Sequence, residues 1–143
     1  MIRTLASLPV LAVALAGCVG EEEKSSTPVQ TECAVTRVYD GDTLGLLCGG
    51  GPAELVRLAG LDAPEIARAN CADERAKGVK ARAALERLVA SGPVTDRRIM
   101  GRHPDGRRLV ELDIGGRDLG RAMVETGLAL PTPNAEYRDW CAG

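Results

Sequence analysis

The spacing of hydrophobic residues predicts a β-hairpin near the start of the folded part of the chain. Residues 34–40 (AVTRVYD) alternate between apolar and polar side chains, as does part of 43–47, and this two-residue period is typical of half-buried strands. The Asp40-Gly41 pair between them is a common two-residue hairpin turn. Residues 54–61 (ELVRLAGL) predict a third strand, which the following proline brings to an end.

The period then changes to that of a helix. Apolar side chains recur near helical spacing over residues 73–90, and the Ser-Gly-Pro sequence at 91–93 ends the segment. Residues 94–100 and 107–114 predict two more strands. A Pro-Asp-Gly turn at 104–106 joins them.

A second helix is predicted at the carboxyl end, where Asp118 is a candidate N-cap and Gly127 a candidate stop. The order of elements is therefore three strands, a helix, two strands and a helix. This order suits a small closed barrel of the OB type. We predict a mainly β, α+β fold: a five-stranded OB-fold barrel with a helix after the third strand and a C-terminal helix. A different α+β sheet is the alternative.

Residues 1–17 have the pattern of a secretory signal and not of a folded segment. Arg3 supplies the positive start, and the apolar run 5–16 is too short for a stable membrane-spanning helix. Small residues precede Cys18, which resembles a bacterial lipoprotein signal, where the cysteine is acylated and becomes the new amino terminus. An ordinary secretory signal with an incidental cysteine is the alternative. Residues 18–32 are polar without periodicity and predict a flexible tether ahead of a domain at 33–143.

Export would place the remaining cysteines in an oxidising compartment, where disulfides persist. Four cysteines follow the tether and permit three pairings: Cys33, Cys48, Cys71 and Cys141. With the predicted two-residue turn, Cys33 and Cys48 face each other across the hairpin, which leaves Cys71 and Cys141 for a second bridge. A zinc site is the alternative, although the chain has no Cys-x-x-Cys spacing and its single histidine lies far from any cysteine in sequence.

Composition and charge limit the classes of function. The 143 residues are 45% hydrophobic and 27% charged, which is ordinary for a globular protein. The net charge is −2, and residues 33–143 alone contain sixteen acidic and sixteen basic side chains. Phenylalanine is absent, and aromatic residues make up 2% of the chain. Nothing here indicates the cationic groove with aromatic platforms that non-catalytic single-strand binders use.

Three carboxylates and two arginines stand where the predicted strands meet loops. Asp42, Asp62 and Glu65 offer hard oxygen ligands of the kind that Ca²⁺ and Mg²⁺ prefer. Arg57 and Arg107 offer guanidinium groups that match phosphate oxygens. A metal, a carboxylate that handles water and fixed cations are the parts that phosphodiester hydrolysis needs.

Each of these signals alone has a simpler explanation, a hairpin turn for the first carboxylate and solvated surface charge for the others. Arg57 and Asp62 would also point to opposite faces of a regular strand. They can share a site only where the strand ends or bulges, which Gly60 would allow. Tyr137 and Trp140 are better explained as cover for an aromatic-poor core than as platforms for base stacking.

Four stretches of sequence, in this order, carry a resemblance to a known family: VYDGDTL, VRLAGLDAPE, DGRRL and GRDLGRAMVETGLA. Between residues 38 and 129 the chain is similar to the staphylococcal nuclease (thermonuclease) family. The resemblance implies an OB-fold barrel and calcium-dependent cleavage of DNA, RNA or both that leaves 3′-phosphate ends.

The resemblance also implies roles for individual residues. Asp42 and Asp62 correspond to the carboxylates that bind the metal, together with the backbone carbonyl of Ala63. Glu65 corresponds to the residue that orients or deprotonates the attacking water.

Arg57 and Arg107 correspond to the pair that binds the scissile phosphate and stabilises its transition state. The chain departs from the family just before Arg107. The founding member has Lys-Tyr where this chain has Pro104 and Asp105, so that a negative charge replaces a lysine and a stacking tyrosine. Since stacking contributes roughly 1–3 kcal/mol per base, we expect weaker substrate binding rather than lost chemistry.

Two other functions are consistent with the fold. One is a non-catalytic OB module that binds single-stranded nucleic acid, which the neutral charge and few aromatics argue against. The other is a structural envelope lipoprotein, which leaves the carboxylates and arginines unexplained. We expect Ca²⁺ as cofactor, single-stranded DNA or RNA as substrate, a membrane contact through Cys18, and a monomer without a protein partner.

The lipoprotein interpretation predicts an exported chain anchored at Cys18. Val19 after it favours the outer membrane, facing the periplasm or the cell surface. Several acyl chains on one residue anchor firmly, whereas a single chain is marginal. Mass spectrometry of the membrane-extracted chain should show acylated Cys18 as the first residue, and Cys18→Ser should remove the acyl mass. An unmodified mature Cys18 would contradict the prediction.

Overall fold

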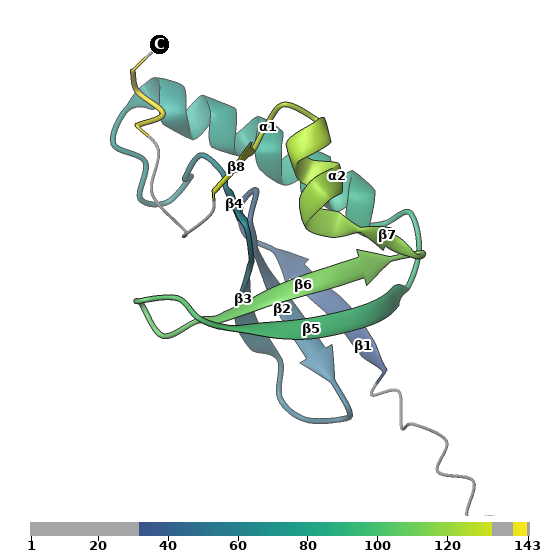
Figure 1. Ribbon diagram of the computed structural model, residues 1–143. Helices are drawn as coiled ribbons and strands as arrows, with labels where there is room; N and C mark the ends of the chain where they lie inside the picture. Colours follow the sequence, from purple (N-terminus) through teal and green to yellow (C-terminus); the bar gives the residue numbers. More distant parts are fainter. Residues whose placement is uncertain (1–31, 133–138, 143) are drawn as a thin grey trace, which may run out of the picture.

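Figure 1 shows the computed structural model, a curled β-sheet with both helices on one side of it. The structure describes residues 32–132 and 139–142. The predicted signal segment, Cys18 and the tether up to residue 31 lie outside the described residues, as does Tyr137.

The first two strands form the predicted hairpin. β1 (Cys33–Val38) pairs antiparallel with β2 (Thr43–Cys48), and Cys33 lies opposite Cys48 in the register. The two cysteines form a disulfide, as the hairpin geometry predicts.

The turn of this hairpin differs from the predicted Asp40-Gly41 pair. The register shifts by one residue between Val35 and Arg37, and a loop over residues 39–42 joins the strands. The backbone N–H of Tyr39 closes this loop on the carbonyl of Thr43 at 2.9 Å. The bulge and the wider loop have a structural consequence, because they turn the side chain of the last loop residue into the protein, where it is buried.

The predicted third strand is divided into two by a turn. β3 (Glu54–Leu58) ends before Ala59, and β4 (Leu61–Asp62) follows Gly60, whose φ of 76° is in the region that glycine favours. β4 pairs with β8 (Leu130–Pro131) in a small second sheet that the sequence pattern did not predict.

The main sheet has the strand order expected of an OB barrel. β5 (Val94–Arg102) and β6 (Arg108–Ile114) form a second hairpin, and β6 also pairs in parallel with β3. The resulting order is β1-β2-β3-β6-β5, with β7 (Arg117–Asp118) on β6. β1 and β5 are in contact, so that the sheet curls toward closure. The prediction of an OB-type α+β fold is confirmed.

Two helices cover one side of the sheet. α1 (Ala72–Val89) follows the third strand, and α2 (Leu119–Glu125) follows β7 (Figure 1). Asp118 caps α2 by accepting a hydrogen bond from the Arg121 backbone N–H at 2.6 Å. The chain leaves α2 through Gly127, at a φ of 75°. Cap and stop are the residues predicted from the sequence.

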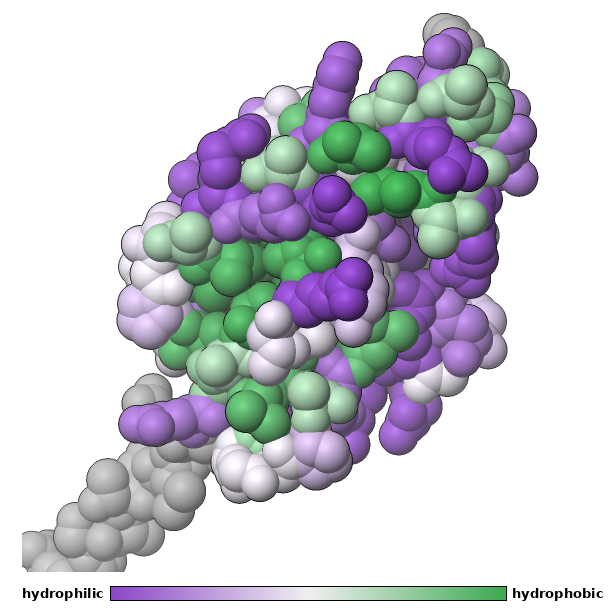
Figure 2. Space-filling view, turned by 180° about the vertical axis from the view of Figure 1, so that it is seen from behind, coloured by the Kyte–Doolittle hydropathy of each residue, from purple (hydrophilic) through white to green (hydrophobic). Residues whose placement is uncertain are grey.

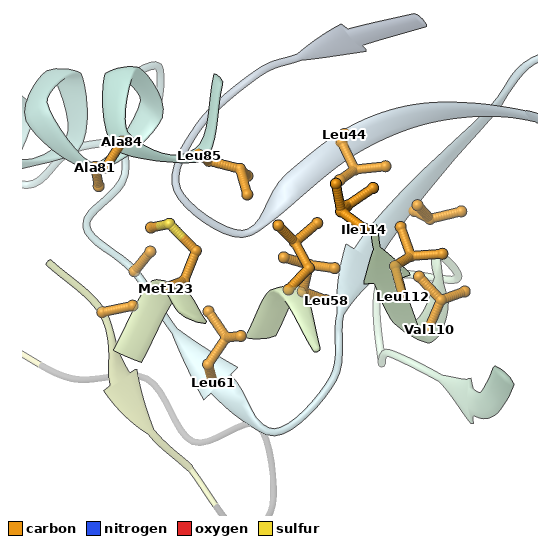
Figure 3. Close-up of a cluster of buried hydrophobic side chains, with 14 of the residues drawn as sticks. Leu44, Leu58, Leu61, Ala81, Ala84, Leu85, Val110, Leu112, Ile114 and Met123 are labelled. Carbon is orange, nitrogen blue, oxygen red and sulfur yellow. The ribbon is translucent and has the colours of Figure 1, made fainter. Parts of the chain in front are cut away.

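The core between sheet and helices is aliphatic (Figure 3). Among its members, Leu44, Leu85, Leu112 and Met123 have no exposed surface. On the opposite face of the molecule from Figure 1, hydrophobic residues are visible between hydrophilic ones (Figure 2). Within the described part of the chain, neither helix combines the length and apolar character required to cross a membrane.

A second disulfide joins Cys71, at the start of α1, to Cys141 near the end of the chain. Both bridges are the predicted ones. The zinc alternative is therefore wrong for these cysteines, because each of the four sulfur atoms is bonded to one other in a disulfide.

Gly78 lies where α1 meets the loop after β4, and it predicts a steric effect on stability. A Cβ at this position would lie 2.7 Å from the carbonyl oxygen of Glu65 and 2.8 Å from that of Pro64. Because both are backbone atoms, Gly78→Ala should lower the free energy of unfolding by roughly 1–3 kcal/mol in urea titrations. This loss should appear although alanine is the better helix former by about 1 kcal/mol.

Gly120→Ala in α2 is the matched control. Its Cβ would first meet a side-chain atom and not the backbone, at 3.1 Å from Leu61 Cδ2. If the two variants have equal free energies of unfolding, the backbone contact at Gly78 does not exclude a side chain there, and the prediction is wrong.

Candidate functional site

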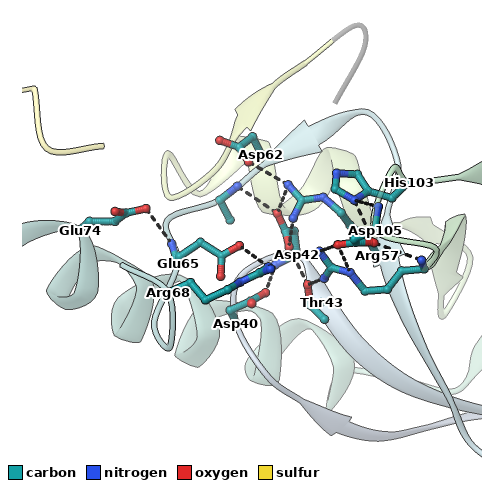
Figure 4. A network of polar contacts seen from close by, with 12 residues as sticks. Asp40, Asp42, Thr43, Arg57, Asp62, Glu65, Arg68, Glu74, His103 and Asp105 are labelled. Carbon is teal, nitrogen blue, oxygen red and sulfur yellow. Dashed lines mark hydrogen bonds and ion pairs between the residues drawn. The ribbon is translucent and has the colours of Figure 1, made fainter. Parts of the chain in front are cut away.

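Arg57 lies between two buried carboxylates at the centre of the candidate site (Figure 4). Its Nη1 donates to Asp42 Oδ1 at 3.0 Å, and its Nη2 lies 2.7 Å from Asp42 Oδ2. The same Nη2 donates to Asp62 Oδ1 at 2.8 Å. All three side chains are at most 3% exposed, so these ion pairs are shielded from solvent.

Strand geometry explains why residues from three segments meet here. Arg57 lies in β3, and Asp62 lies in β4 beyond the turn at Gly60. Side chains alternate between the two faces only along a continuous strand. Because the turn at Gly60 interrupts the strand, Arg57 and Asp62 can face the same site. Asp42 arrives from the hairpin loop and precedes Thr43, which pairs with Arg57 across β2 and β3.

Asp42 is held by further hydrogen bonds. The hydroxyl of Thr43 donates to Oδ1 at 2.8 Å, and the backbone N–H of Ala63 donates to Oδ2 at 3.2 Å. Its own backbone N–H donates to Asp40 Oδ1 at 3.2 Å. The carboxylate is therefore fixed in position by side chain and backbone donors together.

The charge of this cluster is not balanced internally. With both carboxylates ionised, the three side chains would carry a net charge of −1. Burial raises the pKa of Asp42 to about 8, and the neighbouring Asp40 adds to the rise, while Arg57 and the Thr43 hydroxyl oppose it. Physically, the buried site favours the arrival of one more positive charge, either a proton or a cation.

Glu65 lies in the loop between β4 and α1, and α1 fixes its backbone. Its N–H donates to Glu74 Oε1 at 3.3 Å, and the other oxygen of Glu74 accepts from the Asn70 N–H at 2.7 Å. Arg68 donates to the Glu65 carboxylate at 3.1 Å. Glu65 lines a cavity of about 190 Å³ together with Asp62 and Ala63. Glu65 therefore borders the same partly open pocket as the buried Asp62.

Arg107 reaches the cluster from the turn before β6. Its Nη1 donates to the hydroxyl of Thr43 at 2.6 Å, and this hydroxyl in turn donates to Asp42. Its Nε donates to Asp105 Oδ2 at 2.8 Å. Burial works to lower the pKa of Arg107, but the hydrogen bond and the charge of Asp105 outweigh it, and the pKa is raised.

Asp105 forms an internal partner for Arg107. The hydrogen bond from the guanidinium is the main cause that holds the pKa of Asp105 well below its usual range. Nδ1 of the buried His103 also lies 3.0 Å from Asp105 Oδ1. Asp105 therefore stays ionised at neutral pH and holds the guanidinium of Arg107.

The structure thus brings the five predicted side chains together in one region, where ion pairs, hydrogen bonds through Thr43 and a shared pocket connect them. Arg57 links the two aspartates directly, Thr43 links Arg107 to Asp42, and the cavity joins Glu65 to Asp62. A larger cavity of about 340 Å³, bordered by residues such as Leu58, contains none of the five predicted side chains.

Sequence reasoning missed several residues of the site, most of all Trp140. Its indole Nε1 donates to Asp62 Oδ2 at 3.0 Å, which is a specific contact and not general cover. Thr43 and Glu74 were missed as well. Thr43 follows Asp42 directly and could have been found by adjacency, whereas no local pattern connects residue 140 with residue 62.

Comparison with known proteins gives a family match. A family model described as staphylococcal nuclease homologue matches residues 55–139. The match includes Arg57, Asp62, Glu65 and Arg107. No curated protein matches the chain.

Proposed function

Since the chain belongs to the staphylococcal nuclease family, we propose that it is a calcium-dependent nuclease. It would hydrolyse phosphodiester bonds of DNA, RNA or both by attack of water and leave 3′-phosphate ends. The observation that carries the proposal is the pair of buried aspartates on Arg57, with Glu65 in the adjoining cavity.

The donor atoms of the site fit a calcium ion. Asp42, Asp62 and the carbonyl of Ala63 would hold it, and all of them offer the oxygen ligands that calcium prefers. Burial raises the pKa of Asp42, so that its carboxylate takes up a positive charge readily, and a bound calcium ion would replace the proton there. When bound, the ion would polarise the phosphate and offset its developing charge.

The remaining side chains divide the chemistry among them. Glu65 would orient the attacking water and accept its proton, and Glu74 keeps the backbone of Glu65 in place for this task. Arg57 and Arg107 would donate to phosphate oxygens as negative charge develops in the transition state. Arg107 must first give up its bond to Asp105.

We further propose that the enzyme works outside the cytoplasm as a lipid-anchored monomer that prefers single-stranded substrate. The pattern around Cys18 supports the anchor. The two disulfides support an oxidising compartment.

Removal of one catalytic group at a time tests the reaction. With a single-stranded DNA substrate, the parent should cleave in calcium and not in chelator. Glu65→Gln and Arg107→Ala should each lower kcat by roughly 10²–10³-fold, because each removes a group that acts in the transition state. Arg108→Ala is the matched control, since this neighbouring arginine pairs with Glu54 at 3.0 Å instead of reaching the site.

Near-normal rates in both variants would contradict the assignment of these residues. Binding of DNA that persists in chelator, without cleavage under any condition, would instead favour the non-catalytic OB module.

Removal of the internal partner of Arg107 should improve substrate binding. Asp105→Asn frees the guanidinium and removes a negative charge near the substrate, so KM should fall, with a smaller effect at high salt. Asp105→Tyr should lower KM further, because a stacked base adds roughly 1–3 kcal/mol. Asp96→Asn is the control for charge alone, as Asp96 pairs with Arg98 on β5. An unchanged KM in both Asp105 variants would count against competition by this carboxylate.

A further inference from the structure

The end of the chain returns to the acidic site. Trp140 Nε1 donates to Asp62 Oδ2 at 3.0 Å, while Arg57 donates to the other oxygen of the same carboxylate at 2.8 Å. Asp62 is therefore held from two sides, and its rotation about the side-chain bonds is restricted. An indole N–H can only donate a hydrogen bond, so it fixes the carboxylate but cannot itself bind a cation.

Trp140 belongs to no helix or strand, and α1 holds it in place. The neighbouring Cys141 is bonded to Cys71, the N-cap of α1, and Lys77 of the same helix donates to the Trp140 carbonyl at 2.8 Å. The first turns of α1 thus anchor the tryptophan by one covalent bond and one hydrogen bond. They also hold Glu65, through Glu74.

The position of the indole matters for the cavity as well. Trp140 lines the same space of about 190 Å³ as Asp62 and Glu65. Its side chain is partly exposed. A polar partner that fixes a ligating carboxylate typically contributes about 10–100-fold in metal affinity or activity.

We propose that Trp140 is a positioning residue for Asp62 and that the Cys71–Cys141 disulfide sets its position. The inference rests on the proposed function, since Asp62 is one of the residues assigned to calcium. The disulfide then contributes to the metal site as well as to stability. Loss of the bridge or of the indole N–H removes the hydrogen bond to Asp62 Oδ2 and weakens calcium binding.

Two variants separate the indole from its anchor. Trp140→Phe removes the N–H and keeps an aromatic ring, whereas Cys71→Ser with Cys141→Ser keeps the indole and removes the bridge. The matched control is Cys33→Ser with Cys48→Ser, which removes the disulfide at the base of the first hairpin and leaves Trp140 anchored. Thermal unfolding of each variant shows whether it is folded at the temperature of the assay.

Calcium binding is measured by calorimetry and, wherever Trp140 is retained, by fluorescence. Trp140 is the single tryptophan of the chain, so its emission reports on this site alone. Trp140→Phe and the Cys71/Cys141 variant should bind calcium roughly tenfold more weakly than the parent, and the Cys33/Cys48 control should not. In the parent and the control, calcium should change the emission. In the Cys71/Cys141 variant the emission should be shifted to the red, and calcium should not change it.

The outcomes distinguish this inference from the proposed function. If the parent binds calcium and cleaves DNA but Trp140→Phe binds calcium equally well, the positioning role is wrong and the nuclease assignment stands. An equal loss in both cysteine variants would also overturn it, because the effect would then be one of general stability. If the parent itself binds no calcium, the proposed function fails and this inference fails with it.

Discussion

Two buried carboxylates share one guanidinium in this protein, and their pairing restricts the positions of the segments that carry them. Asp42 and Asp62 are separated by twenty positions in sequence, yet both contact Arg57 at 3.0 Å or less. Ionised groups are stable in the interior only when they are paired and hydrogen-bonded, and loss of one partner typically destabilises by roughly 3–5 kcal/mol. The hairpin loop and the strands that carry them therefore cannot shift by a residue without leaving a buried charge uncompensated. The barrel supplies the rigidity that this arrangement requires.

Three other features of the fold position the residues of this cluster and of the adjoining pocket. The widened loop of the first hairpin turns Asp42 inward, and the turn at Gly60 returns the chain so that Asp62 faces Arg57. Close approach at Gly78 brings α1 against the loop of Glu65. The pocket that results is lined by two buried carboxylates, as the proposed calcium site requires.

Much of this could be read from the sequence, because the signals involved are local. The two-residue period and the facing cysteines predicted the first hairpin and its disulfide, and the caps at Asp118 and Gly127 predicted α2. The turn at Asp40-Gly41 was wrong because a bulge leaves no trace in the pattern of apolar residues. The contact of Trp140 with Asp62 could not be predicted, since it depends on a long-range crosslink that only the folded chain brings about. The same holds for Asp105: its charge was evident from the sequence, but its pairing with Arg107 depends on the shape of the turn.

The two disulfides also divide the chain into covalent rings. The first joins cysteines 15 residues apart and encloses the loop of Asp42, and the second joins cysteines 70 residues apart and encloses both strands of the second hairpin together with α1 and α2. Arg57, Asp62 and Glu65 lie on the open segment between the rings, and Arg107 lies inside the larger one. A single backbone cut anywhere between Cys71 and Cys141 therefore leaves both fragments attached to each other. Proteolytic nicking within that ring opens a loop but does not release a piece.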